Sequence, residues 1–154
     1  MSPRECLSDI QLVMANAMKY NQDGSAWKET GIICTFSAGW GWVDSLYGKM
    51  LVAARGIDEI GDDDYLVRLG EKIINLERAL NVREGLSRKE DTLPQRMLTE
   101  PLHTGDAPGE GQIVRHQDEF LDNYYNLRGW TKEGVPTAEK LNALGIGYAA
   151  KDMP

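Results

Sequence analysis

Apolar residues recur at steps of three and four near the start of the chain. The repeating positions are Leu7, Ile10, Met14 and Ala17. Such spacing predicts a helix over residues 5–20 with one apolar face. The polar run at residues 21–25, Asn-Gln-Asp-Gly-Ser, is typical of a turn and predicts the end of this helix.

A longer amphipathic pattern begins at three consecutive acidic residues, positions 62–64. Acidic side chains at a helix start interact favourably with the positive end of the helix dipole. The apolar series that follows is Leu66, Leu69, Ile73, Leu76 and Leu80. We expect this helix to end near Arg83, with Gly85 just beyond it. A shorter helix is expected over residues 43–55 and should end at Gly56.

The last third of the chain alternates between loops and short helices. Residues 99–115 contain two prolines and three glycines, which predicts an extended surface loop. A helix is expected over 117–128, ended by Gly129, and Thr137 should cap a last short helix closed by Gly145. The patterns together predict an all-α fold, as a single irregular multi-helix domain spanning residues 1–154.

Composition and charge narrow the classes of function. With 17 basic and 24 acidic side chains among 154 residues, the net charge is −7, which argues against a nucleic-acid-binding face or a polybasic membrane patch. No apolar run approaches the roughly 18–20 residues of a membrane helix. The N-terminal residues do not resemble a signal peptide, so we expect a cytoplasmic protein.

The charge is unevenly distributed along the chain. Residues 1–56 carry five basic and five acidic side chains, so the whole net charge lies in residues 57–154. The neutral first part is rich in small residues, aromatic residues and methionine. We therefore expect it to be buried or to make contacts, and the acidic part to be solvated.

Two cysteines and two histidines are too few for a self-contained zinc or iron–sulfur site. Cys34 lies in an apolar stretch between Ile33 and Phe36, where a cysteine is usually a small buried residue. The alternative is a thiolate that completes a metal site whose other ligands lie elsewhere. His103 and His116 are expected at the surface, and no nucleophile–base set or phosphate-binding loop is present.

Longer motifs resemble a known family. They are the run Glu71–Arg78, the run Asn81–Gly85, the run Ser87–Pro94 and the tail motif Arg128-Gly129-Trp130. These segments are similar to the C-terminal domain of the tungsten-containing aldehyde ferredoxin oxidoreductase family. The resemblance is strong over residues 66–146 and looser over residues 1–65.

The resemblance implies a multidomain enzyme with a buried cofactor. In this family a base domain carries a tungsten or molybdenum bis-pterin, and two mostly helical domains cover it. A [4Fe–4S] cluster beside one pterin passes electrons to ferredoxin. Three cluster cysteines come from the middle domain, and the fourth comes from the last domain in the pattern Asp-x-x-Gly-Leu-Cys-x-Phe, a segment that also reaches the pterin.

Residues 29–36 are the nearest match to that pattern. The resemblance implies that Cys34 is the metal ligand and that Glu29 and Ile33 are cofactor-binding residues. Ile32 occupies the glycine position, where a branched side chain would crowd a pterin approaching the backbone. Glu29 replaces the shorter aspartate of the pattern.

The family's base domain, other cluster cysteines and proton-handling residues are missing from this sequence. We therefore assign no catalytic residue and expect the isolated chain to be inactive and without cofactor. The complete enzyme would convert an aldehyde and water to a carboxylic acid. Its expected partners are the missing N-terminal and middle domains, ferredoxin and a second copy of the chain.

A second hypothesis is a non-catalytic helical interaction module. Trp27, Trp40 and Trp42 would then form an exposed adhesive patch that binds a partner subunit or a second copy. Iron and tungsten analysis of the purified chain would separate the two hypotheses.

Overall fold

The computed structural model describes residues 3–34, 36, 42–101 and 114–153, and of residues 3–8, 42–45 and 152 only the backbone. The elements of the described residues are α1 (Pro3–Thr30), α3 (Trp42–Arg55), η1 (Asp58–Gly61), α4 (Asp63–Arg83), α5 (Gln95–Thr99), α6 (Gln117–Arg128), α7 (Ala138–Ala143) and η2 (Gly147–Asp152). In this part of the chain an isolated bridge joins Trp130 and Pro136, and no strand is present. The predicted all-α fold is confirmed.

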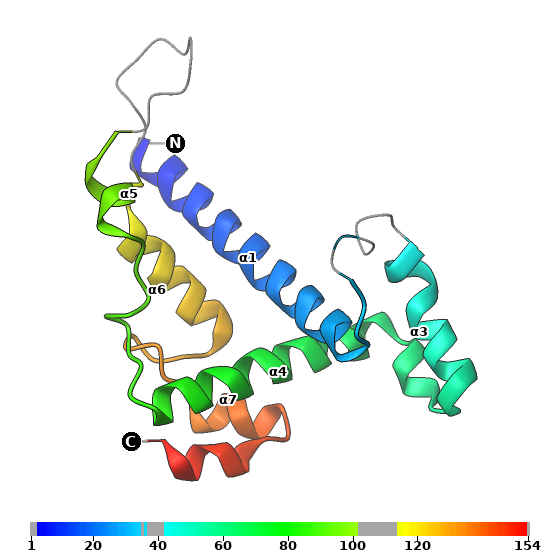
Figure 1. The fold of residues 1–154 in the computed structure, drawn as a ribbon. Helices are drawn as coiled ribbons and strands as arrows, with labels where there is room; N and C mark the ends of the chain where they lie inside the picture. Colours follow the sequence, from blue (N-terminus) through cyan, green and yellow to red (C-terminus); the bar gives the residue numbers. More distant parts are fainter. Residues whose placement is uncertain (1–2, 35, 37–41, 102–113, 154) are drawn as a thin grey trace.

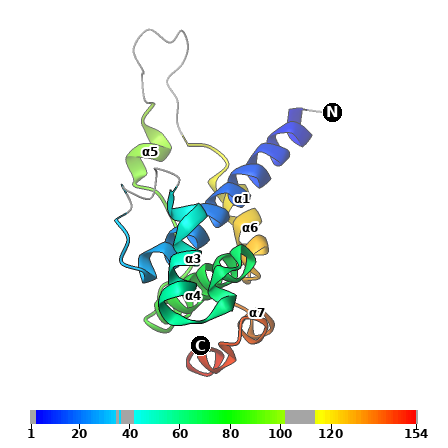
Figure 2. The same ribbon diagram turned by 90° about the vertical axis from the view of Figure 1, so that its right-hand side faces the viewer.

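Three helices organise the molecule, as Figure 1 shows. The long helix α1 contacts both α4 and α6, and its hydrogen bonds with α6 lie at Lys19, Gln22 and Asp23. Helix α7 and the short helix η2 pack below α4 (Figure 2), while α3 and η1 lie together beyond the far end of α1. None of the described helices is long and apolar enough to cross a membrane.

The helix ends follow their local sequence signals closely. The Asp62 side chain accepts a hydrogen bond from the Asp64 amide at 3.0 Å and caps α4, as expected for an acidic helix start. Thr137 caps α7 in the same way, accepting from the Lys140 amide at 3.2 Å. Gly129 ends α6 with a φ of 70°, a left-handed conformation that glycine adopts without strain.

The predicted end of the first helix at residues 21–25 is wrong, because α1 continues to Thr30. The polar residues that suggested a turn are held in the helix by side chains from elsewhere. Asp23 is only 1% exposed and pairs with Lys19 and with Arg128 of α6. Tertiary hydrogen bonds thus satisfy the groups that would otherwise favour a turn.

The predicted buried faces of α1 and α4 are also wrong in part. Ile10 and Met14 are about half exposed, whereas Gln11 and Ala15 are buried. On α4, Leu66 is buried as expected, but Leu76 and Leu80 are exposed and their places in the interior are taken by polar side chains. These buried polar residues of α4 are Asn75 and Arg78.

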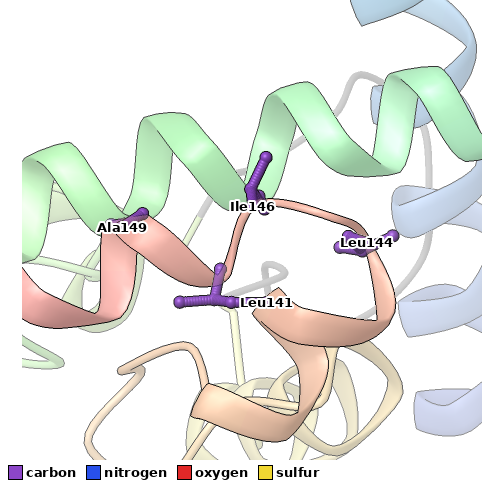
Figure 3. Packing of buried hydrophobic residues seen from close by; sticks show 5 residues of the cluster. Leu141, Leu144, Ile146 and Ala149 are labelled. Atoms are coloured by element: carbon purple, nitrogen blue, oxygen red, sulfur yellow. The ribbon is translucent and has the colours of Figure 1, made fainter.

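The C-terminal core closes against α4. Leu141, Leu144, Ile146 and Ala149 form a cluster with Ala79 (Figure 3), and Leu141 is fully buried. The short helix η2, which sequence patterns do not predict, supplies Ala149 to this cluster. Burial of these side chains fixes the end of the chain below α4.

Close approach of α1 and α4 depends on a glycine. A Cβ atom at Gly70 would lie 1.9 Å from the Asp23 carbonyl oxygen, well inside van der Waals contact. Gly70 therefore lets the backbones of the two helices meet directly. This contact places the last turns of α1, and the loop that follows them, beside the start of α4 (Figure 1).

Two sequence expectations fall partly outside the described residues. Of the predicted loop over 99–115, residues 102–113, including His103, are not described. The adhesive tryptophan patch is wrong for Trp27, which is 6% exposed and stacks on Tyr47. Trp40 and the side chain of Trp42 lie outside the described residues.

Candidate functional site

The segment that carries Cys34 begins where α1 ends. The Gly31 amide donates to the Lys28 carbonyl at 3.1 Å, and the Ile32 amide donates to the Glu29 carbonyl at 2.9 Å. A Cβ atom at Gly31 would lie 1.4 Å from the Tyr47 hydroxyl, so a side chain here would displace the Tyr47 ring of α3. The absence of a side chain at Gly31 therefore lets Tyr47 of α3 pack directly against this turn.

Ile32 adopts an unusual backbone conformation. Its φ of 56° lies in the left-handed region, which β-branched residues rarely adopt. Its side chain is 94% exposed and is not buried against the protein. A strained residue of this kind costs on the order of 1–3 kcal/mol and is found preferentially at functional sites. The backbone thus has the conformation that favours glycine, the residue expected at this position from the family pattern.

The next two residues have different environments. Ile33 is half-buried and packs against the cluster of Trp27, Tyr47 and Leu66, which anchors the loop. Cys34 is exposed, which contradicts the alternative of a small buried residue. Phe36 is also exposed, at 91%. The anchor therefore holds Cys34 at the surface beside the end of α1.

Glu29 is exposed in the last turn of α1 and lines a groove of about 260 Å³ with Ser25 of the same helix and Glu77 of α4. Glu29, Ile33 and Cys34 thus all lie in the last turn of α1 or in the segment directly after it. The Ile33 side chain packs against the interior of the protein, whereas Glu29 and Cys34 are exposed to solvent.

Cys34 is not part of a complete metal site within the described residues. Among them no group of three or more histidine, cysteine, aspartate or glutamate side chains could hold a metal ion. One exposed cysteine does fit a chain that contributes a single ligand to a site shared with other polypeptide. His116 is exposed at the start of α6, as predicted, with Nδ1 3.6 Å from Glu119.

A buried polar centre between α1 and α6 is the feature that sequence reasoning missed. Arg128 is fully buried and pairs with Asp23, and its Nη2 donates to Gln22 Oε1 at 2.7 Å. Its Nε donates to the Tyr124 hydroxyl at 3.0 Å. Burial is the main reason that the pKa of Tyr124 is raised above its ordinary value, and the nearby negative charge of Asp23 adds to it. This phenol therefore stays neutral.

A second polar centre joins α4 to the segment after it. Arg78 donates from Nη1 and Nη2 to the Asp91 carboxylate, at 2.9 and 2.6 Å, and from Nε to the Gly134 carbonyl at 2.7 Å. Tyr125 donates to the same carboxylate, and burial together with that carboxylate raises the pKa of Tyr125.

Comparison with known proteins places this geometry in context. The family model described as aldehyde ferredoxin oxidoreductase, domains 2 and 3, matches residues 7–146. The tungsten-containing aldehyde ferredoxin oxidoreductase of Pyrococcus horikoshii is 46% identical over 127 residues, and that of Pyrococcus furiosus is 43% identical. In both cases the match covers 81% of this chain and 20% of the relative.

More distant relatives extend the comparison. The aliphatic sulfonate oxidoreductase WOR-like subunit of Pyrococcus furiosus is 28% identical over 134 residues. Among solved structures, the active-site complex BamBC of benzoyl coenzyme A reductase, in complex with 1,5-dienoyl-CoA, matches with a TM-score of 0.53 and 30% identity. That match covers 69% of this chain and 14% of the other.

The chain thus spans about a fifth of the length of the aldehyde ferredoxin oxidoreductases that it matches. The match includes both the motifs over residues 71–96 and the segment around Cys34. On this evidence the chain belongs to the aldehyde ferredoxin oxidoreductase family.

Proposed function

We propose that this chain is the C-terminal domain of an iron–sulfur aldehyde:ferredoxin oxidoreductase that carries a tungsten or molybdenum bis-pterin. The observation that carries the proposal is an exposed Cys34 on a loop anchored at the end of α1, in a chain of this family. Cys34 supplies one thiolate to a [4Fe–4S] cluster whose other three ligands come from the remainder of the enzyme. The chain is not catalytic alone.

Glu29 and Ile33 have separate roles in this proposal. The exposed Glu29 carboxylate accepts hydrogen bonds from ring N–H groups of a pterin, since an ionised carboxylate offers acceptors only. Ile33 holds the loop through its contact with the cluster of Trp27, Tyr47 and Leu66. The exposed side chain of Ile32 limits how closely a pterin can approach the backbone here, so Glu29 contacts its edge.

The chain's contribution to the reaction is ligation and positioning. In the complete enzyme the metal–pterin supplies the two-electron oxidation of an aldehyde with water to a carboxylic acid. Cys34 holds the cluster at a fixed place, and the protein around the loop sets its exposure to water and hence its potential. When bound, the cluster would supply electron transfer to ferredoxin, and we assign no proton-transfer role to the described residues of this chain.

The outer face of α1 is the surface on which the remainder of the enzyme docks. Ile10, Val13 and Tyr20 are 49%, 66% and 69% exposed. Apolar side chains repeated on one helix mark contact surfaces, and the chain spans only a fifth of its relatives' length. This agrees with the expectation that the neutral first part of the chain makes contacts.

The test of the cluster role is assembly with the missing polypeptide. The chain is co-expressed with a polypeptide that carries the other four-fifths of the enzyme, and iron content and the cluster's electron paramagnetic resonance spectrum are measured. Cys34→Ser should reduce the iron content or shift the spectrum, because a thiolate ligand is lost. Cys6→Ser, at the chain's other cysteine, is the matched control and should leave both unchanged. Full iron content and an unaltered spectrum in Cys34→Ser would overturn the proposal.

The second candidate is the self-associating interaction module, which the exposed apolar face of α1 favours. Sedimentation of the purified chain distinguishes the two functions. Concentration-dependent dimers that Val13→Glu abolishes, without metal in any preparation or assembly, support the module. Cluster formation only after assembly with the remaining polypeptide supports the oxidoreductase.

A further inference from the structure

A cavity of about 630 Å³ lies between α1, which lines it from Gln11 to Gln22, and helix α6, and α4 with the segment after it completes the lining. Ligand sites in proteins are commonly 300–1,000 Å³ in volume. Met14 and Cys34 are separated by some 16 residues of helix, which corresponds to roughly 24 Å along α1. The cavity lining includes no residue of the loop that carries Cys34, although Gln22, Ile74 and Glu77 also line the groove beside Glu29.

The walls of the cavity are mostly apolar. Met14 and Met18 of α1, Ile74 of α4, and Phe120 and Leu121 of α6 line it. Methionine side chains are flexible and polarisable, so they adapt to ligands of different outline. Aromatic rings add large contact areas with little loss of conformational freedom. These walls suit a molecule that is recognised by shape and apolar contact.

Several polar side chains that line the cavity are already committed to partners within the protein. Arg78 uses Nε, Nη1 and Nη2 in hydrogen bonds to Gly134 and Asp91, and the Asp91 carboxylate also accepts from Tyr125. The Trp130 indole N–H donates to Asn75 at 2.8 Å. A charged ligand group beside these residues would lose its hydration and find them occupied. Gln11 and Asn81, which also line the cavity, are neutral amides and would not balance its charge.

Charged residues occur at the rim in both signs. Glu77 and Glu90 line one part and Arg115 another. Glu90 accepts hydrogen bonds from the Ser87 amide and hydroxyl, at 2.7 and 2.8 Å, which hold it at the surface. Because both signs of charge are present, the rim does not exclude ligands of either charge. The base and the walls of the cavity therefore determine which ligands bind.

We propose that this cavity binds a neutral, predominantly apolar small molecule with a ring or a branched body. The methionines and aromatic side chains hold the ligand by contact, and the self-paired base excludes anions. The inference rests on the cavity itself and holds for either of the two candidate functions. Every lining residue named here belongs to this chain.

The test uses two probes with the same ring system, neutral 2-acetylnaphthalene and anionic 2-naphthoate. Each is titrated into the full chain labelled with ¹⁵N, and the indole N–H signals are followed by NMR. The neutral probe should shift the Trp130 signal saturably and leave the Trp27 signal, from the other aromatic cluster, unchanged. The anion should bind at least about tenfold more weakly, since its carboxylate would be desolvated without a partner.

Matched variants on α1 locate the binding site. Met18→Glu places a charge in the cavity wall and should abolish binding, whereas Tyr20→Glu, on the outer face, should leave it unchanged. Circular dichroism checks that both variants fold, and Met14→Phe, which fills space, replaces Met18→Glu if that variant unfolds. Equal affinity for the two probes, undiminished binding in Met18→Glu, or loss of probe binding once the remaining polypeptide is assembled would overturn the proposal.

Discussion

Two regions of this molecule are held together by different chemistry. Helices α1, α4 and α6 are joined by buried charged groups, with Arg128 and Asp23 both almost fully inaccessible to solvent. The loop after α1 and helix α3 are attached instead by apolar contacts of Trp27, Tyr47 and Leu66. Figure 1 shows α3 beyond the end of α1, on the side opposite to α6.

The difference between the two regions bears on function. Hydrogen bonds and ion pairs are directional, so a buried charged junction fixes the relative position of the helices that it joins. Apolar contacts are not directional and permit small adjustments of the joined parts. Cys34 and Glu29 thus lie where the chain can adapt to a neighbour, while the cavity lies where the helices are fixed.

The largest effect is expected from breaking the charged junction. Arg128→Met leaves Asp23 buried without its partner, and we expect the free energy of unfolding to fall by about 3–5 kcal/mol. Urea denaturation followed by circular dichroism measures this loss. Arg83→Met removes an arginine paired with Glu84 at the surface and should change stability by no more than about 0.5 kcal/mol. A loss below about 1 kcal/mol in Arg128→Met would show that apolar packing holds both regions.

A smaller effect is expected at the contact of α1 with α4. Glycine to alanine inside a helix ordinarily stabilises by up to about 1 kcal/mol. Gly70→Ala should instead destabilise by about 1–3 kcal/mol, because the new methyl group meets the Asp23 carbonyl. Gly24→Ala is the control, since a Cβ there meets nothing within 4 Å, and it should stabilise the protein. Equal signs for the two variants would contradict the close contact.

Glu71 connects α1 to α7 and should give a modest, pH-dependent contribution. Its carboxylate lies 3.0 Å from Lys19 Nζ and 2.8 Å from Lys140 Nζ. Burial opposes ionisation, but the hydrogen bonds from Lys140 and Lys19 outweigh it and lower the pKa of Glu71 below its ordinary 4.5. Stabilisation is therefore complete above about pH 4.5 and is lost as the pH falls through the folded pKa.

Glu71→Gln tests this contribution. Near pH 7 we expect a loss of about 1–2 kcal/mol, measured by denaturation, because two partly buried ammonium groups lose their shared carboxylate. The difference from the unchanged protein should shrink below pH 4.5. Glu77→Gln, at an exposed position of the same helix, should leave the acid dependence as it is. A difference between Glu71→Gln and the unchanged protein that is constant from pH 3 to pH 7 would exclude the linkage.

The smallest effect on global stability is expected in the apolar region. Tyr47→Ala removes a ring stacked on Trp27 with centroids 5.7 Å apart. Amide hydrogen exchange in α3 should speed up by at least about tenfold, while global unfolding changes by less than about 1 kcal/mol, because α3 opens locally. Tyr124→Ala, in the fixed region, should accelerate exchange in α1 and α6 together. Loss of global stability in Tyr47→Ala would show that the two regions unfold as one.

Local signals in the sequence predicted the ends of α4, α6 and α7 well, but the end of α1 wrongly and the buried faces poorly. Asp62, Thr137 and Gly129 act within a few residues of themselves, so their roles can be read from neighbouring positions. Arg78 and Arg128 occupy interior positions only because partners distant in the sequence satisfy their charges. No periodicity of apolar residues indicates such partners, and apolar leucines such as Leu76 are displaced to the surface as a result.

The candidate site was predicted from the resemblance of residues 29–36 to a family pattern, and the local chemistry of these residues did not predict the exposure of Cys34. Apolar neighbours on both sides of Cys34 suggested burial, yet the alternation of Ile33 inward and Cys34 outward leaves the thiol exposed. The family pattern indicated which segment to consider, but it did not indicate how the side chains of that segment are oriented. The roles of Glu29, Ile33 and Cys34 toward cofactors stay predictions until the assembled enzyme is measured.

The pairing of Asp23 with Arg128 has a consequence for how the chain is made. The two residues are 105 positions apart, so during synthesis the first helix emerges long before the arginine that stabilises its middle. Because the polar run at residues 21–25 favours a turn without this pair, we expect a ribosome stalled before residue 128 to carry a chain whose first helix bends at Asp23.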